Sequence, residues 1–133
     1  MLQKLNTRRG GFTLVEIMIV VAIIALLAAI AVPNFLRARK RSQATRVLED
    51  LRMIDSAIDQ YAIETNKVSN ASVAWTDIKA YLKTGSALYN SGGADLFGNT
   101  FGTFKVDVLP SVPPTTKSAL ADVAPPEFWS PFK

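Results

Sequence analysis

A run of sixteen consecutive apolar residues, at positions 17–32, limits what this chain of 133 residues can fold into. Apolar residues continue the run on both sides, so residues 12–36 form a segment long enough to cross a hydrocarbon layer of about 30 Å as a helix. A helix that is apolar around its whole circumference is surrounded by lipid or by other helices, not by water. The rest of the chain has room for only one small folded body.

The helix is expected to continue well past this segment. Residues 12–65 contain no glycine and a single proline, Pro33. Beyond residue 36 the apolar side chains recur at spacings of four, three, four and three, the period of an amphipathic helix with one narrow apolar stripe. This stripe consists of Val47, Leu51, Ile54, Ile58 and Tyr61. A body this small does not need so long a helix for its own core, so part of the helix is expected to contact other molecules.

Residues 66–133 contain six of the seven prolines and most of the turn-forming residues. For this part we expect a short capped helix at 76–82, a turn between two strands at 96–101, a strand at 104–108, and another strand or turn at 118–123. Three aromatic residues near the C-terminus are expected to dock on this body: Phe128, Trp129 and Phe132. The predicted fold class is α+β, a lollipop whose long N-terminal helix packs with its second half on a small antiparallel sheet.

Composition excludes several classes of function. The chain has no cysteine and no histidine, so it cannot form a disulfide, a structural zinc site, or a thiol or imidazole catalytic centre. The net charge of +4 comes mostly from Lys4, Arg8 and Arg9, since without them twelve basic side chains face eleven acidic ones. We therefore expect no nucleic-acid partner. The acids of residues 66–133 have no nucleophile-and-base spacing, so no enzyme activity is expected.

The segment at residues 8–16 combines three informative features. Basic residues precede the apolar run, as they do when the N-terminus of a membrane helix is cytoplasmic. Gly10 and Gly11 leave the backbone bare and flexible, which suits entry into a protease cleft. Glu16 then places a carboxylate inside an apolar run, where a central charge costs about 2.5–3.5 kcal/mol on insertion scales.

Glu16 needs a partner, and the neighbouring apolar sequence offers none. Cleavage of the bond between Gly11 and Phe12 would create an α-amino group on Phe12, which titrates near pH 7.7–8.0 and is largely protonated at neutral pH. The amine of one chain could neutralise Glu16 of another in a helix bundle, and a mispaired register would leave both charges buried and unpaired. In the alternative interpretation, Glu16 lies near the cytoplasmic face and reaches water.

The sequences G-F-T-L-V-E at residues 11–16 and I-M-I-V-V-A-I-I-A-L-L-A-A-I-A-V-P-N-F at residues 17–35 resemble the N-terminal region of type IV pilins and type II secretion pseudopilins. The resemblance implies that a membrane prepilin peptidase cleaves after Gly11 and methylates the new amine of Phe12. It also implies that Glu16 serves subunit assembly.

The same resemblance implies a kink or local unwinding at Pro33, which cannot donate a hydrogen bond to the preceding turn. The implied partners are further copies of the subunit, the prepilin peptidase, a membrane platform, a cytoplasmic ATPase and inner-membrane lipid. The implied location is the bacterial inner membrane, with a single span, a cytoplasmic N-terminus and a periplasmic body, followed by a filament in the periplasm or at the cell surface.

The predicted organisation has four parts: a cleaved cytoplasmic basic leader at 1–11, a transmembrane and filament-core helix at 12–36, its amphipathic continuation at 37–65, and a small periplasmic body at 66–133. Four basic residues follow the span directly: Arg37, Arg39, Lys40 and Arg41. They are at least as positive as the leader, so charge counting alone does not orient the span. Lipid head groups, acids of adjacent subunits and plain solvation are all possible roles for this cluster.

Within the family, the sequence favours a type II secretion pseudopilin that takes part in protein export. Residues 95–101, D-L-F-G-N-T-F, resemble the Asp-Pro-Trp-Gly-Asn-Pro-Tyr turn of major pseudopilins, with departures at Leu96 and Thr100. The chain also lacks the cysteine pair of many pilins. A type IV pilus pilin, used in adhesion, motility or DNA uptake, is the alternative.

The resemblance to major pseudopilins also implies a calcium ion, although no cofactor is otherwise expected. The candidate ligands are hard oxygen donors: Asp95, Asn99, Asp107 and Asp122. Their spacing does not match a D-x-D-x-D-G loop.

Two further interpretations stay open. The first is an ordinary secretory signal peptide, for which residues 29–31, A-I-A, offer a cleavage pattern. The second is a plain single-span anchor of a periplasmic protein.

Overall fold

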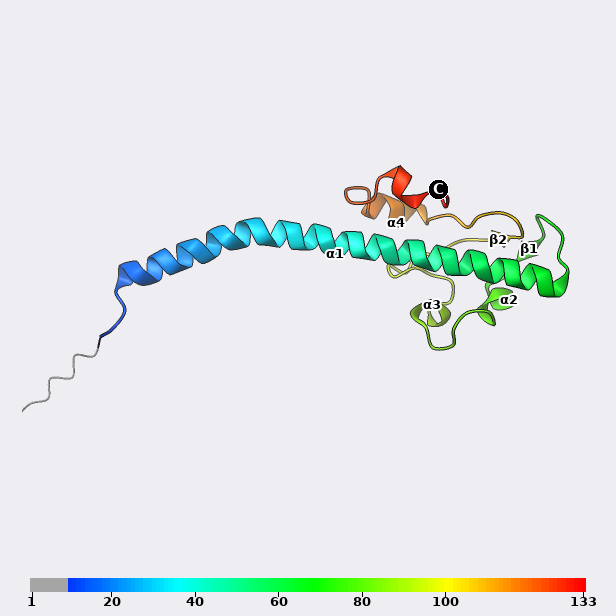
Figure 1. Ribbon diagram of the computed structural model, residues 1–133, viewed down its shortest axis with the longest axis horizontal. Helices are drawn as coiled ribbons and strands as arrows, with labels where there is room; N and C mark the ends of the chain where they lie inside the picture. The colour runs from blue at the N-terminus through cyan, green and yellow to red at the C-terminus, as the bar shows by residue number, and fades with distance from the viewer. Residues whose placement is uncertain (1–9) are drawn as a thin grey trace, which may run out of the picture. The chain divides into compact units, whose positions relative to one another are not determined.

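The computed structural model describes residues 10–133, and the basic residues Lys4, Arg8 and Arg9 of the predicted leader lie outside the described residues. The chain divides into two compact units, Met1–Leu36 and Arg37–Lys133, which are described separately below (Figure 1).

One helix, α1, runs from Leu14 to Thr65 and confirms the prediction of a long N-terminal helix. Helical geometry continues through Pro33 without interruption, so the implied kink stays a prediction. In the first unit, every described side chain up to Leu36 is exposed, and the most apolar window of α1 has a mean hydropathy of 3.0 with none of it buried. The length and composition of this helix are sufficient for one membrane span.

The second unit is built around the apolar stripe of α1. The stripe positions Val47, Leu51, Ile54 and Ile58 are all buried, and Tyr61 is partly buried, which confirms the predicted face. The face is completed by small and apolar neighbours one turn away: Ala44, Leu48 and Ala57.

The sheet of this unit is small. Strand β1 (Ser72–Val73) pairs antiparallel with β2 (Phe104–Lys105), with Val73 opposite Phe104. The strand expected at 104–108 is shorter than predicted, because Asp107 has a φ of 59° and the chain turns back, so that the Val108 amide donates to the Lys105 carbonyl at 3.3 Å. The hairpin expected at 96–101 is reduced to a turn with one bridge, between Ala94 and Thr100.

Short helices accompany the sheet, and the first of them lies where a short helix at 76–82 was predicted. They are α2 (Trp75–Lys79), α3 (Ala87–Asn90), α4 (Pro114–Ala119) and a 3₁₀ helix, η1 (Pro126–Trp129). The expectation of a strand or turn at 118–123 was wrong over its first residues, because a proline in the first helical turn, where its missing N–H costs nothing, starts α4. Figure 1 shows α4 on one side of α1, with α2 and α3 on the other.

The C-terminal aromatic residues dock on the body, as predicted. Trp129 is fully buried and Phe132 is 4% exposed. Phe128 is partly buried and meets the Trp129 ring edge-to-face, with 5.2 Å between the ring centroids. The core of this unit therefore joins the stripe of α1 to the end of the chain.

Candidate functional site

The bond between Gly11 and Phe12 lies in an open part of the chain. Residues 10–13 precede the helix, and all four are exposed. No atom lies within 4 Å of a Cβ placed on Gly10 or Gly11, and the Phe12 side chain is 86% exposed. A peptidase could therefore reach this bond without first unfolding α1.

Glu16 closes the first turn of α1 by a reciprocal pair of hydrogen bonds with Thr13. The Thr13 amide donates to Glu16 Oε2 at 3.1 Å, and the Glu16 amide donates to Thr13 Oγ1 at 3.2 Å. This is a capping box, in which the N-cap residue and the third helical residue satisfy each other's free amides. The apolar sequence after Glu16 offers no charge partner, as expected, but Thr13 before it supplies a hydrogen-bonding partner that was not predicted. The spacing T-x-x-E at residues 13–16 carried the signal that the sequence analysis missed.

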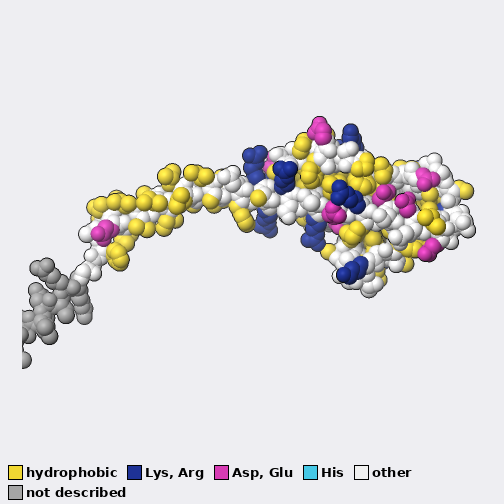
Figure 2. Space-filling model, in the orientation of Figure 1, with side chains coloured by type: hydrophobic (Ala, Val, Ile, Leu, Met, Phe, Trp, Pro, Cys, Tyr) yellow, Lys and Arg dark blue, Asp and Glu magenta, His cyan; other side chains and the backbone are white. Residues whose placement is uncertain are grey.

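Within residues 10–36, the described part of its unit, no cation balances the charge of Glu16. Residues 10–36 contain no lysine or arginine, so Glu16 is their one ionisable side chain. Only Oε2 accepts a hydrogen bond within the part of the chain that the structure describes. The partial positive charge of the helix N-terminus favours the carboxylate there but does not neutralise it. Oε1 accepts no hydrogen bond from the described residues. Figure 2 shows hydrophobic side chains along this end of the helix.

In the second unit, two of the candidate calcium ligands belong to one buried network. Asp95 is 5% exposed, and its Oδ1 accepts the amides of Phe97 at 2.9 Å and Asn99 at 3.0 Å. The hydroxyl of Thr116 donates to Asp95 Oδ2. The side-chain amide of Asn99 donates to Thr116 Oγ1 at 2.8 Å. No local pattern in the sequence points to Thr116, since 21 residues separate it from Asp95.

The other two candidate ligands lie elsewhere. Asp107 is exposed in the turn after β2, and Asp122 forms an ion pair with Lys40, with 3.0 Å between Nζ and Oδ2. The hydrogen bond from Lys40 holds the pKa of Asp122 below its ordinary value. Residues 10–133 contain no group of three or more acids placed to hold a metal ion. The three acids among the candidates do not form one cluster in the described residues, and the implied calcium ion stays a prediction.

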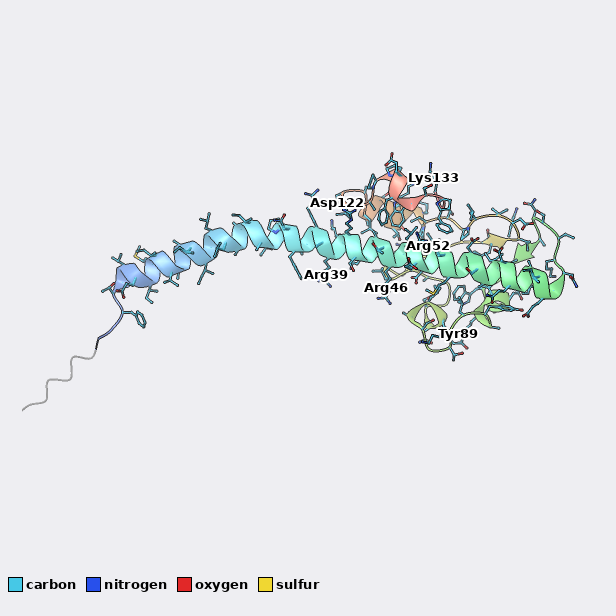
Figure 3. All side chains as sticks on the ribbon, in the orientation of Figure 1. Arg39, Arg46, Arg52, Tyr89, Asp122 and Lys133 are labelled. Atoms are coloured by element: carbon cyan, nitrogen blue, oxygen red, sulfur yellow. The ribbon has the colours of Figure 1, made fainter. Side chains whose placement is uncertain are left out.

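Asp50 is a further buried acid that the sequence analysis did not single out. It lies on α1, is 8% exposed and lines a small cavity of about 60 Å³ together with Arg46 and Asp95. Burial raises the pKa of Asp50, Arg46 opposes this, and the negative charges of Asp95 and Glu49 add to it. Figure 3 shows Arg46 and Arg39 on the side of α1 opposite Asp122.

Comparisons with known proteins agree with this arrangement. Residues 6–32 match the family described as the prokaryotic N-terminal methylation motif. A type IV major fimbrial protein, FimA of Dichelobacter nodosus, is 32% identical over 127 residues, which cover 84% of this chain and 81% of FimA.

Two further relatives match over smaller parts. The type IV wide pilus major component PilA4 of Thermus thermophilus is 44% identical over 48% of this chain and 49% of its own. The type II secretion system core protein G of Pectobacterium carotovorum is 35% identical over 45% of this chain and 38% of its own. No solved structure gives a significant match.

An exposed apolar helix, capped at an N-terminal methylation motif and continued into a small α+β body, defines a class of proteins that act as structural subunits. The chain belongs to the family of type IV pilins and type II secretion pseudopilins.

Proposed function

We propose that this chain is a filament subunit that is cleaved between Gly11 and Phe12 and polymerises through the first half of α1. The observation that carries the proposal is the exposed apolar helix whose one charge, Glu16, is half satisfied by its own cap. Each Å² of apolar surface that is removed from water stabilises the packed state by about 25 cal/mol. Packing between such helices is therefore strongly favourable outside lipid.

Cleavage supplies the missing charge. The new α-amino group would stand on Phe12, directly before the N-cap residue Thr13. Glu16 Oε1, which the capping box leaves free, is the atom available to a second subunit's amine. Helix packing and this charge pair would then replace lipid contacts as the subunit leaves the bilayer. In any other register, the Glu16 carboxylate and the Phe12 amine would be buried without a partner, which costs free energy and disfavours that arrangement.

The proposed processing and location follow the family. A prepilin peptidase would cut after Gly11 and N-methylate Phe12, and a membrane platform with a cytoplasmic ATPase would drive polymerisation. Before assembly, the chain would span the inner membrane once, with its N-terminus in the cytoplasm and its body in the periplasm. The exposed Gly11–Phe12 junction supports access by the peptidase.

Among the filament types, we propose a type IV pilus, because the match to FimA covers most of both chains. A type II secretion pseudopilus is the second candidate. It is favoured by the turn at residues 95–101, whose Asp95 accepts the amides of Phe97 and Asn99. Deletion of the gene separates the two. Loss of surface filaments with an unchanged set of secreted proteins supports a pilus, and the reverse result supports secretion.

The substitution Glu16→Ala tests the assembly step. We expect cleavage and methylation at Phe12 to persist, while the yield of sheared filaments falls by more than about tenfold, because a buried amine left without its carboxylate costs several kcal/mol. Mass spectrometry of the N-terminus and of the sheared fraction measures the two effects separately.

Three controls sharpen this test. Thr13→Ala removes the cap, worth about 1 kcal/mol, but keeps the charge, so filaments should still form. Glu16→Gln keeps the shape and should fail like alanine. Asp59→Ala removes an exposed acid of the same helix and should have no effect. Normal filaments from Glu16→Ala would refute the proposed charge pair.

A further inference from the structure

Four basic side chains follow the apolar part of α1 within five positions: Arg37, Arg39, Lys40 and Arg41, here called the basic collar. All four are exposed. No acid occurs in the sequence of residues 37–48, so the helix itself supplies the collar with no counter-charge over that stretch.

The collar covers two sides of the helix. At about 100° of rotation per residue, Arg37, Lys40 and Arg41 share one face at i, i+3 and i+4, and Arg39 points to the opposite side. Figure 2 shows Lys and Arg side chains projecting from opposite sides of α1 in this region. In Figure 3, Arg39 lies on the side of α1 away from Asp122, the partner of Lys40. A neighbouring protein on one side of the helix would contact either Arg39 or the other three residues, whereas a layer perpendicular to the axis contacts all four.

Most of the collar forms no ion pair with the described residues of its own chain. Within residues 10–133, Lys40 is the one collar residue that forms an ion pair, with Asp122. After the hydrogen bond from Lys40, the positive charge of Arg37 also contributes to lowering the pKa of Asp122. Arg39 and Arg41 have no carboxylate within 4.0 Å among these described residues. Their guanidinium groups are open to an external anion.

The position of the collar along the chain matches the depth of lipid phosphates. The helical residues before it, from Leu14 to Leu36, are all exposed and span about 34 Å at 1.5 Å per residue, close to the thickness of a hydrocarbon core. Once this segment lies in the core, the next residues emerge among the head groups. Guanidinium groups bind phosphate oxygens in a bidentate manner, and long basic side chains reach outward from a helix end.

We propose that the basic collar binds the phosphodiester head groups of anionic phospholipids in the leaflet where the span ends. The proposal rests on membrane insertion of the first half of α1, which is part of the proposed function, but not on filament formation. The collar would anchor the unassembled subunit at a defined depth, and release from these lipids would be part of leaving the membrane.

The test uses the full chain in liposomes that contain phosphatidylcholine and phosphatidylglycerol. Spin-labelled forms of the two lipids report, by electron paramagnetic resonance, which lipid is held at the protein surface. We expect the wild-type chain to prefer phosphatidylglycerol several-fold. The triple substitution Arg37→Gln, Arg39→Gln, Arg41→Gln should remove most of the preference, since a single charge near an anionic surface contributes up to about fivefold.

Matched variants separate charge from folding. Lysine at the same three positions should restore the preference, because the charge returns. Replacing Lys79, Lys83 and Lys105 of the body by glutamine removes the same charge far along the chain and should leave the preference intact. Circular dichroism checks that each variant keeps its helix.

Two results would overturn the proposal. One is equal association of both lipids with the wild-type chain. The other is a triple glutamine variant that keeps its lipid preference but loses filament yield, which would assign the collar to acids of neighbouring subunits. A chain that shows the lipid preference yet never polymerises would contradict the proposed function and leave the collar proposal standing.

Discussion

Thr116 has no exposed surface, and its hydroxyl group joins the turn after Ala94 to helix α4. The hydroxyl donates to Asp95 and accepts from Asn99, so one oxygen atom satisfies two polar groups. Asp95 is buried and accepts two amides as well. Polar groups at such depth cost free energy unless each is hydrogen-bonded, so this network holds the turn in one arrangement.

Thr116→Val should destabilise the body by about 1–3 kcal/mol, because it keeps the shape of the side chain but leaves Asp95 Oδ2 and the Asn99 amide without their partner. Chemical denaturation followed by tryptophan fluorescence measures the free energy of unfolding. Thr115→Val is the matched control, since Thr115 lies on the same helix with its side chain exposed. Equal free energies for the two variants would show that the network contributes nothing.

At the scale of elements, the two halves of α1 differ in their surroundings: the first half is exposed, and the second half packs one face on the body. From Ala44 to Ile58 one stripe is buried by the body, while the sheet beside it has only two residues in each strand. So small a sheet contributes little area, and the stripe of α1 supplies much of the core. The stability of the body therefore depends on a helix face more than on strand pairing.

Ile54→Ala should reduce the free energy of unfolding by about 2–5 kcal/mol, because Ile54 is fully buried and its loss leaves a cavity. Ile63→Ala makes the same chemical change on the same helix at a position that is 77% exposed, and should alter stability by no more than about 0.5 kcal/mol. Thermal or urea unfolding of the full chain in detergent compares them. A small effect at Ile54 would contradict the assignment of this stripe to the core.

At the scale of the whole molecule, the two units differ in whether they bury their own apolar surface. The unit Arg37–Lys133 contains every buried apolar residue of the described chain, beginning at Ala44. The described residues of Met1–Leu36 contain none, so their apolar surface must be covered by lipid or by other subunits.

A fragment of residues 37–133 should therefore fold in water without the apolar segment. We expect cooperative unfolding in urea, followed by the fluorescence of the buried Trp129, with a midpoint close to that of the full chain in detergent. A fragment of residues 55–133 lacks the first half of the stripe and should not fold. Gradual unfolding of the longer fragment would mean that the first unit stabilises the second.

The long helix, its apolar stripe, the docked C-terminal aromatic residues and the family were all predictable from the sequence. Each depends on periodicity or on a contiguous motif, which a linear sequence displays directly. The capping box was also predictable from T-x-x-E at residues 13–16, although the charge of Glu16 in an apolar run is the more conspicuous feature of that segment. The strand expected at 104–108 failed because Asp107 reverses the chain, an outcome that alternation of apolar and polar residues does not reveal.

The sequence by itself therefore determined the helix, the membrane-length segment and the N-terminal methylation motif, because these follow from local composition and spacing. Tertiary structure decided which acids have partners. Asp95 accepts a hydrogen bond from Thr116, 21 residues away in the sequence, and Asp122 accepts one from Lys40, 82 residues away. Such pairings depend on how loops and helices pack in three dimensions, and no local pattern encodes them.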